Sequence, residues 1–261
     1  MNILRSRLYI RDFIPPIFKK VKNKLRYYFG DDKRIPPFTN CPQNIDVRWV
    51  IDIGANEGWV AKAALDSYPK SSVICFEPVK RTFEKLQGNL SAYGSRVYYY
   101  NMALSDRNGK NGFETINITS FNGANSLEHQ SDFHKKLNPA VYEIKTETVQ
   151  TARLDEIAQL LPAKKVEIVK IDVEGHELNV LKGGANFLSN CAETIIIEIS
   201  LMRDSSLEHQ ALFDIFSLLN ALGFRLVNIF DLYHAKDTSL MLTQMDCVFR
   251  NIAFLTKYVR D

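Results

Sequence analysis

From residue 46 onward, short and nearly continuous apolar runs alternate with segments in which apolar residues recur every three or four positions. The runs VRWVIDI, VEIVKIDV and TIIIEIS hold few polar residues, which is typical of parallel strands covered by helices on both faces. The pattern predicts helices over residues 60–67, 80–93, 154–161, 177–188 and 207–222. It predicts strands over residues 47–53, 72–76, 96–101, 166–173, 194–200, 224–230 and 247–255.

This alternation predicts an α/β fold with a doubly wound, mostly parallel, seven-stranded sheet. No helical pattern separates the last two strands, so we expect them to form an antiparallel hairpin at one edge of the sheet. Residues 106–151 are rich in Asn, Gly, Ser and Thr and contain the turn signals NGK and NGF, so hairpins and a loop are expected there. In such a sheet a ligand binds beyond the carboxyl ends of the strands, where the strand order reverses.

The N-terminal segment, residues 1–45, is predicted to be a basic, amphipathic, helical appendage to a domain that spans residues 46–261. Its first 34 residues hold ten Lys and Arg against three Asp, a net charge of +7, whereas the whole chain carries +3. A Pro-Pro pair can begin a helix, because proline is tolerated in the first turn. The residues after that pair form one apolar stripe, which comprises Ile17, Val21, Leu25 and Phe29.

The helix predicted over residues 17–29 has more than one interpretation. We favour a helix that packs on the main domain and keeps its basic face in solvent, because amphipathic helices of this kind are common. The alternatives are an interfacial helix in weak contact with anionic lipid, and a lid over a substrate.

Composition and charge exclude several classes of protein. No apolar run approaches the roughly 18–20 residues that span a bilayer, and the N-terminus lacks the apolar core and cleavage site of a signal peptide. The four cysteines are scattered without a Cys-x-x-Cys pair, which predicts a reduced, cytoplasmic protein without a zinc site. The basic excess is confined to the first 34 residues, so no broad nucleic-acid surface is expected.

The stretch VIDIGANEGW places an acid and two glycines directly after the first predicted strand. In a doubly wound fold this turn approaches the ligand closely, and Gly54 and Gly58 would leave room for the contact. A dinucleotide fingerprint would read G-x-G-x-x-G, but Asn56 and Trp59 stand at its second and third glycine positions. Asp52 could face a cationic part of a ligand; a tight strand–helix turn without any ligand is the alternative.

Two further strand ends add polar groups at the same edge of the predicted sheet. Glu77 ends the second strand, roughly 20 residues after the glycines, where a carboxylate can accept hydrogen bonds from both ribose hydroxyls. Asn101 ends the third strand and can offer an amide to an adenine edge, while Met102 offers apolar contact. This order of groups favours S-adenosylmethionine over a nicotinamide dinucleotide.

The motifs DIGANEG, FEP, NMALSD, TARLDEI, KIDVEGHE and TIIIEIS, in this order, resemble the FkbM family of S-adenosylmethionine-dependent methyltransferases. The resemblance covers about residues 46–199. It implies a Rossmann-like class I methyltransferase fold and methyl transfer to oxygen, often a hydroxyl of a sugar or natural product. The residues that it implies for the cofactor site are Asp52, Gly54, Ala55, Asn56, Gly58, Glu77, Pro78, Asn101, Met102 and Asp172.

Charged residues that suit a reaction site gather after the fourth predicted strand. Asp172 is expected near the sulfonium and amino group of the cofactor, and Asp172, Glu174 and His176 form the predicted catalytic set. His176 is the candidate general base, because imidazole has an ordinary pKa of about 6.5. Glu198 and His176 are expected to face the acceptor. The structural alternatives are an ion pair of Lys170 with Asp172 or Glu198, and a His176 that only fills or caps its turn.

A metal ion is a further alternative at the same place. Asp172, Glu174 and Glu198 could gather oxygen ligands for Mg²⁺ or another hard divalent cation. Their spacing in the sequence does not support such a site, so no metal is predicted.

The sequence therefore predicts an S-adenosylmethionine-dependent O-methyltransferase that acts on a hydroxyl of a sugar, in a cell-surface polysaccharide or lipid-linked glycan. One alternative is a nicotinamide-dependent reductase, against which the missing fingerprint counts. Another is a non-catalytic cofactor-binding partner in glycan biosynthesis with a degenerate pocket. The presence of Asp52, Glu77 and Asp172 counts against such a loss of the site. Adenine methylation of nucleic acid is not expected, because VEGHE stands where an N-P-P-Y type motif would follow the fourth strand. The expected location is the cytoplasm, at the inner face of the membrane; the sequence does not predict an oligomeric state.

Overall fold

The computed structural model describes residues 46–109, 112–137, 139–201, 210–234 and 242–255. The predicted N-terminal helix lies outside these residues, so its expected packing on the main domain, and the alternatives of a lipid contact or a lid, stay predictions. Within the part of the chain that the structure describes, no helix is both long and apolar enough to cross a membrane.

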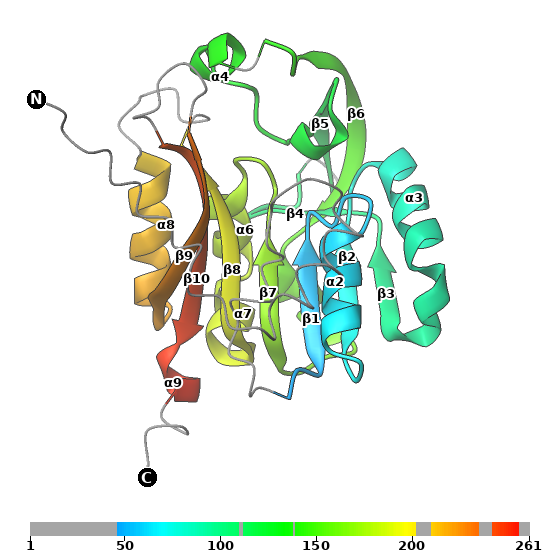
Figure 1. The fold of residues 1–261 in the computed structure, drawn as a ribbon, viewed down its shortest axis with the longest axis vertical. Coiled ribbons are helices and arrows are strands. Elements are labelled where there is room, and N and C mark those ends of the chain that lie inside the picture. Colours follow the sequence, from blue (N-terminus) through cyan, green and yellow to red (C-terminus); the bar gives the residue numbers. More distant parts are fainter. Residues whose placement is uncertain (1–45, 110–111, 138, 202–209, 235–241, 256–261) are drawn as a thin grey trace, which may run out of the picture. The chain divides into compact units, whose positions relative to one another are not determined.

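A seven-stranded sheet forms the centre of the described domain, with strand order β3-β2-β1-β7-β8-β10-β9 (Figure 1). The first five strands in this order run parallel, and β10 is antiparallel to both of its neighbours. The predicted doubly wound sheet with an antiparallel edge hairpin is confirmed. The strands are β1 (Trp49–Ile53), β2 (Ser72–Phe76), β3 (Val97–Tyr100), β7 (Val166–Ile171), β8 (Ala192–Ser200), β9 (Phe224–His234) and β10 (Leu242–Asn251).

The strand order reverses between β1 and β7, which lie side by side although more than 100 residues separate them. Asp52 on β1 is the register partner of Lys170 on β7. One residue further along, the backbone N–H of Asp172 donates to the carbonyl of Ile53 at 3.0 Å. The carboxyl ends of the two strands therefore meet at the switch point, where doubly wound folds place their ligands.

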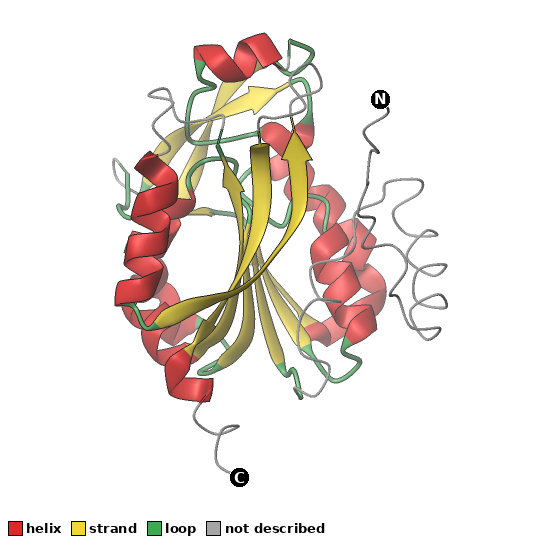
Figure 2. Cartoon of the chain, turned by 60° about the vertical axis from the view of Figure 1, so that its left-hand side comes forward, coloured by secondary structure: helices red, strands yellow, loops and turns green. Residues whose placement is uncertain are grey.

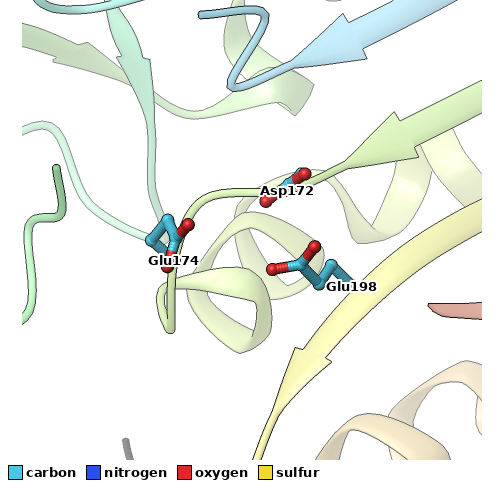
Figure 3. A group of neighbouring side chains, drawn as sticks. All are labelled: Asp172, Glu174 and Glu198. Atoms are coloured by element: carbon cyan, nitrogen blue, oxygen red, sulfur yellow. The ribbon is translucent and has the colours of Figure 1, made fainter. Parts of the chain in front are cut away.

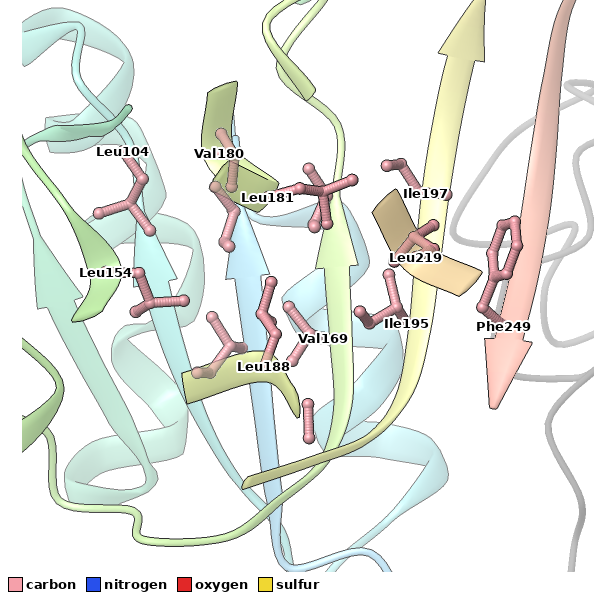
Figure 4. Packing of buried hydrophobic residues seen from close by; sticks show 14 of the residues in the cluster. Leu104, Leu154, Val169, Val180, Leu181, Leu188, Ile195, Ile197, Leu219 and Phe249 are labelled. Carbon is pink, nitrogen blue, oxygen red and sulfur yellow. The ribbon is translucent and has the colours of Figure 1, made fainter. Parts of the chain in front are cut away.

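Helices cover both faces of this sheet (Figure 2). The helix α2 contacts β1 and β2, whereas α6, α7 and α8 contact β8 or β9. Apolar residues of the second face form the main core, in which Val169, Ile195 and Ile197 from the strands meet Val180 and Leu219 from the helices (Figure 4). The helices are α2 (Trp59–Ser67), α3 (Lys80–Leu90), α5 (Leu154–Ile157), α6 (Glu177–Gly183), α7 (Ala185–Cys191) and α8 (Gln210–Ala221).

A second, three-stranded sheet has the order β4-β6-β5, with β5 antiparallel to β6. It confirms the hairpin predicted within residues 106–151, and it lies beyond the carboxyl ends of the central strands, at the top of Figure 1. The short helix α4 between β5 and β6 was not predicted. These elements are β4 (Ala103–Leu104), β5 (Phe113–Thr119), α4 (Asp132–Leu137) and β6 (Glu143–Ala152).

Several predicted elements differ in their bounds from the structure, and two of these differences have a local cause. The helix predicted over residues 177–188 is divided into α6 and α7 at Gly183–Gly184, because glycine is a poor helix former and Gly183 packs against the backbone of Ser105. The strand predicted over residues 247–255 ends at Asn251, and a short helix α9 (Ile252–Leu255) follows it. The side chain of Asn251 accepts a hydrogen bond from the backbone N–H of Ala253, which favours the start of that helix.

Candidate functional site

The glycine turn after β1 is held by the backbone around it. The N–H groups of Gly54 and Ala55 both donate to the carbonyl of Phe76, at 3.0 and 2.9 Å. Gly54 has a φ of +83°, and a Cβ there would lie 1.8 Å from the carbonyl oxygen of Asp172. Gly58 has a φ of +89°, and a Cβ there would lie 2.7 Å from Leu86 of α3. Packing within the fold therefore requires both glycines, whether or not a ligand also approaches them.

Glu77 is buried at the end of β2 and binds the glycine turn. Its carboxylate accepts hydrogen bonds from the backbone N–H groups of Asn56, at 3.0 Å, and Val79, at 2.9 Å. Burial raises the pKa of Glu77 to about 7, although these two hydrogen bonds act to lower it. A carboxylate has about four lone-pair positions, so two remain for a ligand such as a ribose diol.

Asn101 lies beside Glu77, as the sequence led us to expect for successive strand ends. Its side-chain amide donates to the carbonyls of Glu77, at 2.8 Å, and Pro78, at 3.0 Å. Both donors of the amide are therefore used by the backbone, and the amide oxygen is the group left for an adenine edge. Met102 is half-buried and packs against the main core. Adenine contact by these two residues stays a prediction.

Asp52 is 1% exposed, and among the described residues its Oδ2 atom has no hydrogen-bond partner. Burial raises the pKa of Asp52 to about 7; the nearby charge of Lys170 lowers it, and that of Asp172 raises it. A buried acid with an open oxygen is unfavourable in the folded chain alone, because ionisation is disfavoured away from water. The arrangement suits a cationic ligand that would complete the pairing.

The Asp52→Asn variant is expected to remove a pH-dependent loss of stability. Between about pH 4 and pH 7 the folded wild type keeps a proton on Asp52 that the unfolded chain has already lost. Wild-type stability therefore falls as pH rises through this window, by up to about 4 kcal/mol from Asp52 alone. Urea unfolding at several pH values should show that Asp52→Asn is more stable than wild type at pH 8. The free energy of unfolding of the variant should also fall less steeply between about pH 4 and pH 7.

The exposed Asp46 offers a matched control, since Asp46→Asn should leave the pH profile of stability unchanged. Parallel profiles of wild type and Asp52→Asn would contradict the raised pKa of Asp52.

Lys170 is 3% exposed and joins β7 to β10 through its side chain. Its ammonium donates to Asp246 Oδ1 at 2.8 Å and lies 3.5 Å from Asp172 Oδ2. Burial alone would lower the pKa of Lys170, but the carboxylates of Asp246, Asp172 and Glu198 raise it above its ordinary value. The sequence predicted pairing with Asp172 or Glu198 and missed Asp246, the shorter contact. The sequence signal that could have identified Asp246 is its position as the one charged residue in the apolar run MDCVF, because a charged residue in such a run needs a partner.

Three of the predicted site residues converge at the carboxyl ends of β7 and β8: Asp172 and Glu174 follow β7, and Glu198 lies near the end of β8. One carboxylate oxygen from each of Asp172, Glu174 and Glu198 lies within 4.8 Å of the other two (Figure 3). Burial, and then the charge of Asp172, raise the pKa of Glu198 well above its ordinary range. The turn that carries Glu174 is held by the segment between β5 and α4, because the Ser126 hydroxyl donates to the Glu174 carbonyl at 2.8 Å.

His176 is 2% exposed, and both of its ring nitrogens are engaged. Nδ1 lies 2.7 Å from Glu128 Oε1 and donates to it, because a carboxylate can only accept; Nε2 lies 3.0 Å from the Ser105 hydroxyl. No sequence pattern indicated Ser105 or Glu128 as partners, since they lie more than 45 positions away in the chain. The general-base role of His176 stays a prediction, and the geometry favours a role in positioning the turn.

Comparison with known proteins places this site in context. A family model described as the methyltransferase FkbM domain matches residues 52–226. Over 154 residues the chain is 32% identical to the hexuronic acid methyltransferase AglP of Haloferax volcanii, covering 59% of this chain and 56% of the relative. Over 144 residues it is 26% identical to the 2-O-methyltransferase NoeI of Sinorhizobium fredii, covering 54% and 58%. The chain thus spans just over half the length of these two relatives.

Among solved structures, the chain is similar to a methyltransferase FkbM from Methylobacillus flagellatus. The match has 17% sequence identity and a TM-score of 0.46, and it covers 78% of this chain and 44% of that one.

Proposed function

The chain belongs to the FkbM methyltransferase family, and from this premise we propose that it transfers a methyl group from S-adenosylmethionine to an oxygen of a sugar. The observation that carries the proposal is the match to this family over residues 52–226, which include the glycine turn and the acids at the strand ends. Two relatives support a carbohydrate acceptor, since one is named for a hexuronic acid and the other for 2-O-methylation. A polysaccharide or lipid-linked glycan is the acceptor class that we propose.

The residues at the switch point fit the proposed cofactor. The open, buried oxygen of Asp52 suits the ammonium of the methionine part, because that cation would restore the missing pairing. Glu77 has lone pairs left for the ribose hydroxyls, and Asn101 and Met102 are the proposed adenine contacts. The remaining proposed contacts are Gly54, Ala55, Asn56, Gly58, Pro78 and Asp172. When bound, S-adenosylmethionine supplies an electrophilic methyl group on a positively charged sulfur.

The acids beyond β7 and β8 are the proposed acceptor site. A sugar hydroxyl must lose its proton as its oxygen forms the new bond to carbon, so a nearby base assists the reaction. We assign that role to the carboxylates of Asp172, Glu174 and Glu198, of which Glu198 has a raised pKa that favours proton uptake. His176 supports them through the turn that it fills, because its contacts to Ser105 and Glu128 join that turn to the segments that follow β4 and β5.

Labelled S-adenosylmethionine and fractionated glycans test the proposal directly. We expect label to enter glycans that carry hexuronic acid or a free 2-hydroxyl. Release of the label by mild alkali would identify a methyl ester, and retention would identify a methyl ether. We expect Glu77→Gln to weaken cofactor binding by about 1–3 kcal/mol in calorimetry, because the amide presents only one acceptor oxygen to a diol and to two backbone donors.

The exposed Glu84 gives the control, since Glu84→Gln should bind the cofactor as wild type does. Binding of a reduced nicotinamide cofactor, together with no binding of S-adenosylmethionine, would overturn the proposal in favour of a reductase. Cofactor binding without label in any glycan fraction would overturn the proposed acceptor class.

A further inference from the structure

Asp172, Glu174 and Glu198, here called the acidic triad, bring three carboxylates from two chain segments to one point (Figure 3). Carboxylates that approach within 4.8 Å repel one another when ionised. Lys170 reduces this repulsion only in part, because it lies 3.5 Å from Asp172 but makes its shorter contact, at 2.8 Å, with Asp246. Four carboxylates and one lysine therefore lie together among these described side chains.

Glu198 provides a second and separate observation. It is 9% exposed, its carboxylate makes no hydrogen bond with the described residues, and the nearby cation Lys170 makes its closer contacts with Asp246 and Asp172. Figure 3 shows that the carboxylate points toward Asp172 and Glu174 rather than away from them. A largely buried carboxylate that faces two others is unfavourable when ionised unless a cation joins them, so its orientation points to a cationic ligand in the space between the three groups.

The donor set identifies the class of cation. Hard divalent ions bind oxygen at about 2.0–2.6 Å, so two oxygens on one ion lie at most roughly 4–5 Å apart. The 4.8 Å limit within the acidic triad agrees with that spacing. The set contains carboxylates alone, without the imidazole or thiolate ligands that zinc prefers, which favours Mg²⁺, Mn²⁺ or Ca²⁺.

We propose that the acidic triad binds one hard divalent cation, Mg²⁺ or Mn²⁺. Three protein oxygens leave coordination positions for water or for a substrate oxygen, and Asp172 and Glu174 are open enough to admit one. If the proposed function holds, a sugar hydroxyl bound to this ion would have a lowered pKa and would give up its proton to solvent or to a carboxylate more readily. The binding site itself does not depend on that function.

A Mn²⁺ titration of the full chain, after removal of metals with EDTA and without cofactor or acceptor, tests the site. Electron paramagnetic resonance reports free Mn²⁺, and we expect one saturable site per chain that Mg²⁺ displaces. We expect Glu174→Gln and Glu198→Gln each to weaken Mn²⁺ binding at least about tenfold. Glu198→Gln should fold as well as wild type, because it removes one of the mutually repelling charges; circular dichroism checks this.

Glu84→Gln is again the matched control, since it removes an exposed carboxylate outside the acidic triad and should bind Mn²⁺ as wild type does. Binding weaker than about 10⁻³ M in the wild type would overturn the proposal. So would equal affinity in wild type and both triad variants, which would place the ion elsewhere. The titration contains no methyl donor, so its failure would leave the proposed methyl transfer standing.

Discussion

The Lys170→Met variant is expected to lower the free energy of unfolding by about 3–5 kcal/mol, because it removes the cation from a buried charge network. The ammonium of Lys170 contacts Asp246 at 2.8 Å and Asp172 at 3.5 Å, and methionine fills much of the volume without replacing the charge. The change would also raise the pKa of Asp52 further, since Lys170 now lowers it. Urea denaturation at pH 7 measures the loss.

Lys165, which directly precedes β7, gives the matched control. Lys165 lies 3.4 Å from Glu193, but its side chain is 47% exposed, and Arg250 also pairs with Glu193 at 2.9 Å. Lys165→Met should therefore change stability by less than about 1 kcal/mol. The double variant Lys170→Met with Asp246→Asn should recover part of the loss, because it removes the carboxylate left without a partner. Equal effects of the two lysine variants would show that burial does not strengthen the Lys170 network.

The sequence predicted the central sheet well because strand burial leaves a strong local signal. Residues that face α6, α7 and α8 alternate with residues that face the other side, so Val169 and Ile197 enter the core while Lys170 and Glu198 point away from it. The break at Gly183–Gly184 was not predicted, because it depends on a contact with Ser105, which is distant in the sequence. A hydrophobic period carries no information on such a contact.

In the candidate site, too, residues at strand ends could be predicted from the sequence, whereas contacts between distant segments could not. Asp52, Glu77 and Asn101 could be found because each ends a strand, and the ends of parallel strands meet at one edge of a sheet. Asp246 could not be placed, because its approach to Lys170 depends on β10 lying beside β8. The partners of His176 are Ser105, directly after β4, and Glu128, between β5 and α4, and no periodic pattern predicted the arrangement of these segments.

Taken together, the buried ionisable residues form a row across one face of the central sheet. Asp52 on β1 pairs in register with Lys170 on β7, and Glu198 on β8 pairs in register with Asp246 on β10. The register partner of Lys170 on β8 is Ile196, so the row steps by two residues between β7 and β8. Burial raises the pKa of both Asp52 and Glu198, so the row carries a stability penalty that increases with pH. A protein keeps such a penalty where ligand binding offsets it, and the proposed cofactor and cation are the ligands that would do so.

The Gly54→Ala variant is expected to lose about 2–5 kcal/mol of stability, and with it the junction between β1 and β7. The new Cβ would lie 1.8 Å from the Asp172 carbonyl, a backbone atom that cannot move without separating the two strands. The φ of +83° adds a penalty of about 1–2 kcal/mol for any residue with a side chain. Thermal and urea unfolding measure the loss, and failure to fold would be its extreme form.

Gly88→Ala is the matched control, because it makes the same chemical change within the exposed part of α3. A Cβ at Gly88 meets nothing within 4 Å, and alanine favours a helix, so we expect this variant to gain about 0.5–1 kcal/mol. Both variants restrict the unfolded chain equally, so the difference between them reports the folded state alone. Two variants of equal stability would mean that β1 and β7 can move apart at little cost. Asp52 and Asp172 would then not be held at fixed positions on either side of the switch point, and the proposed cofactor site would lose its rigid base.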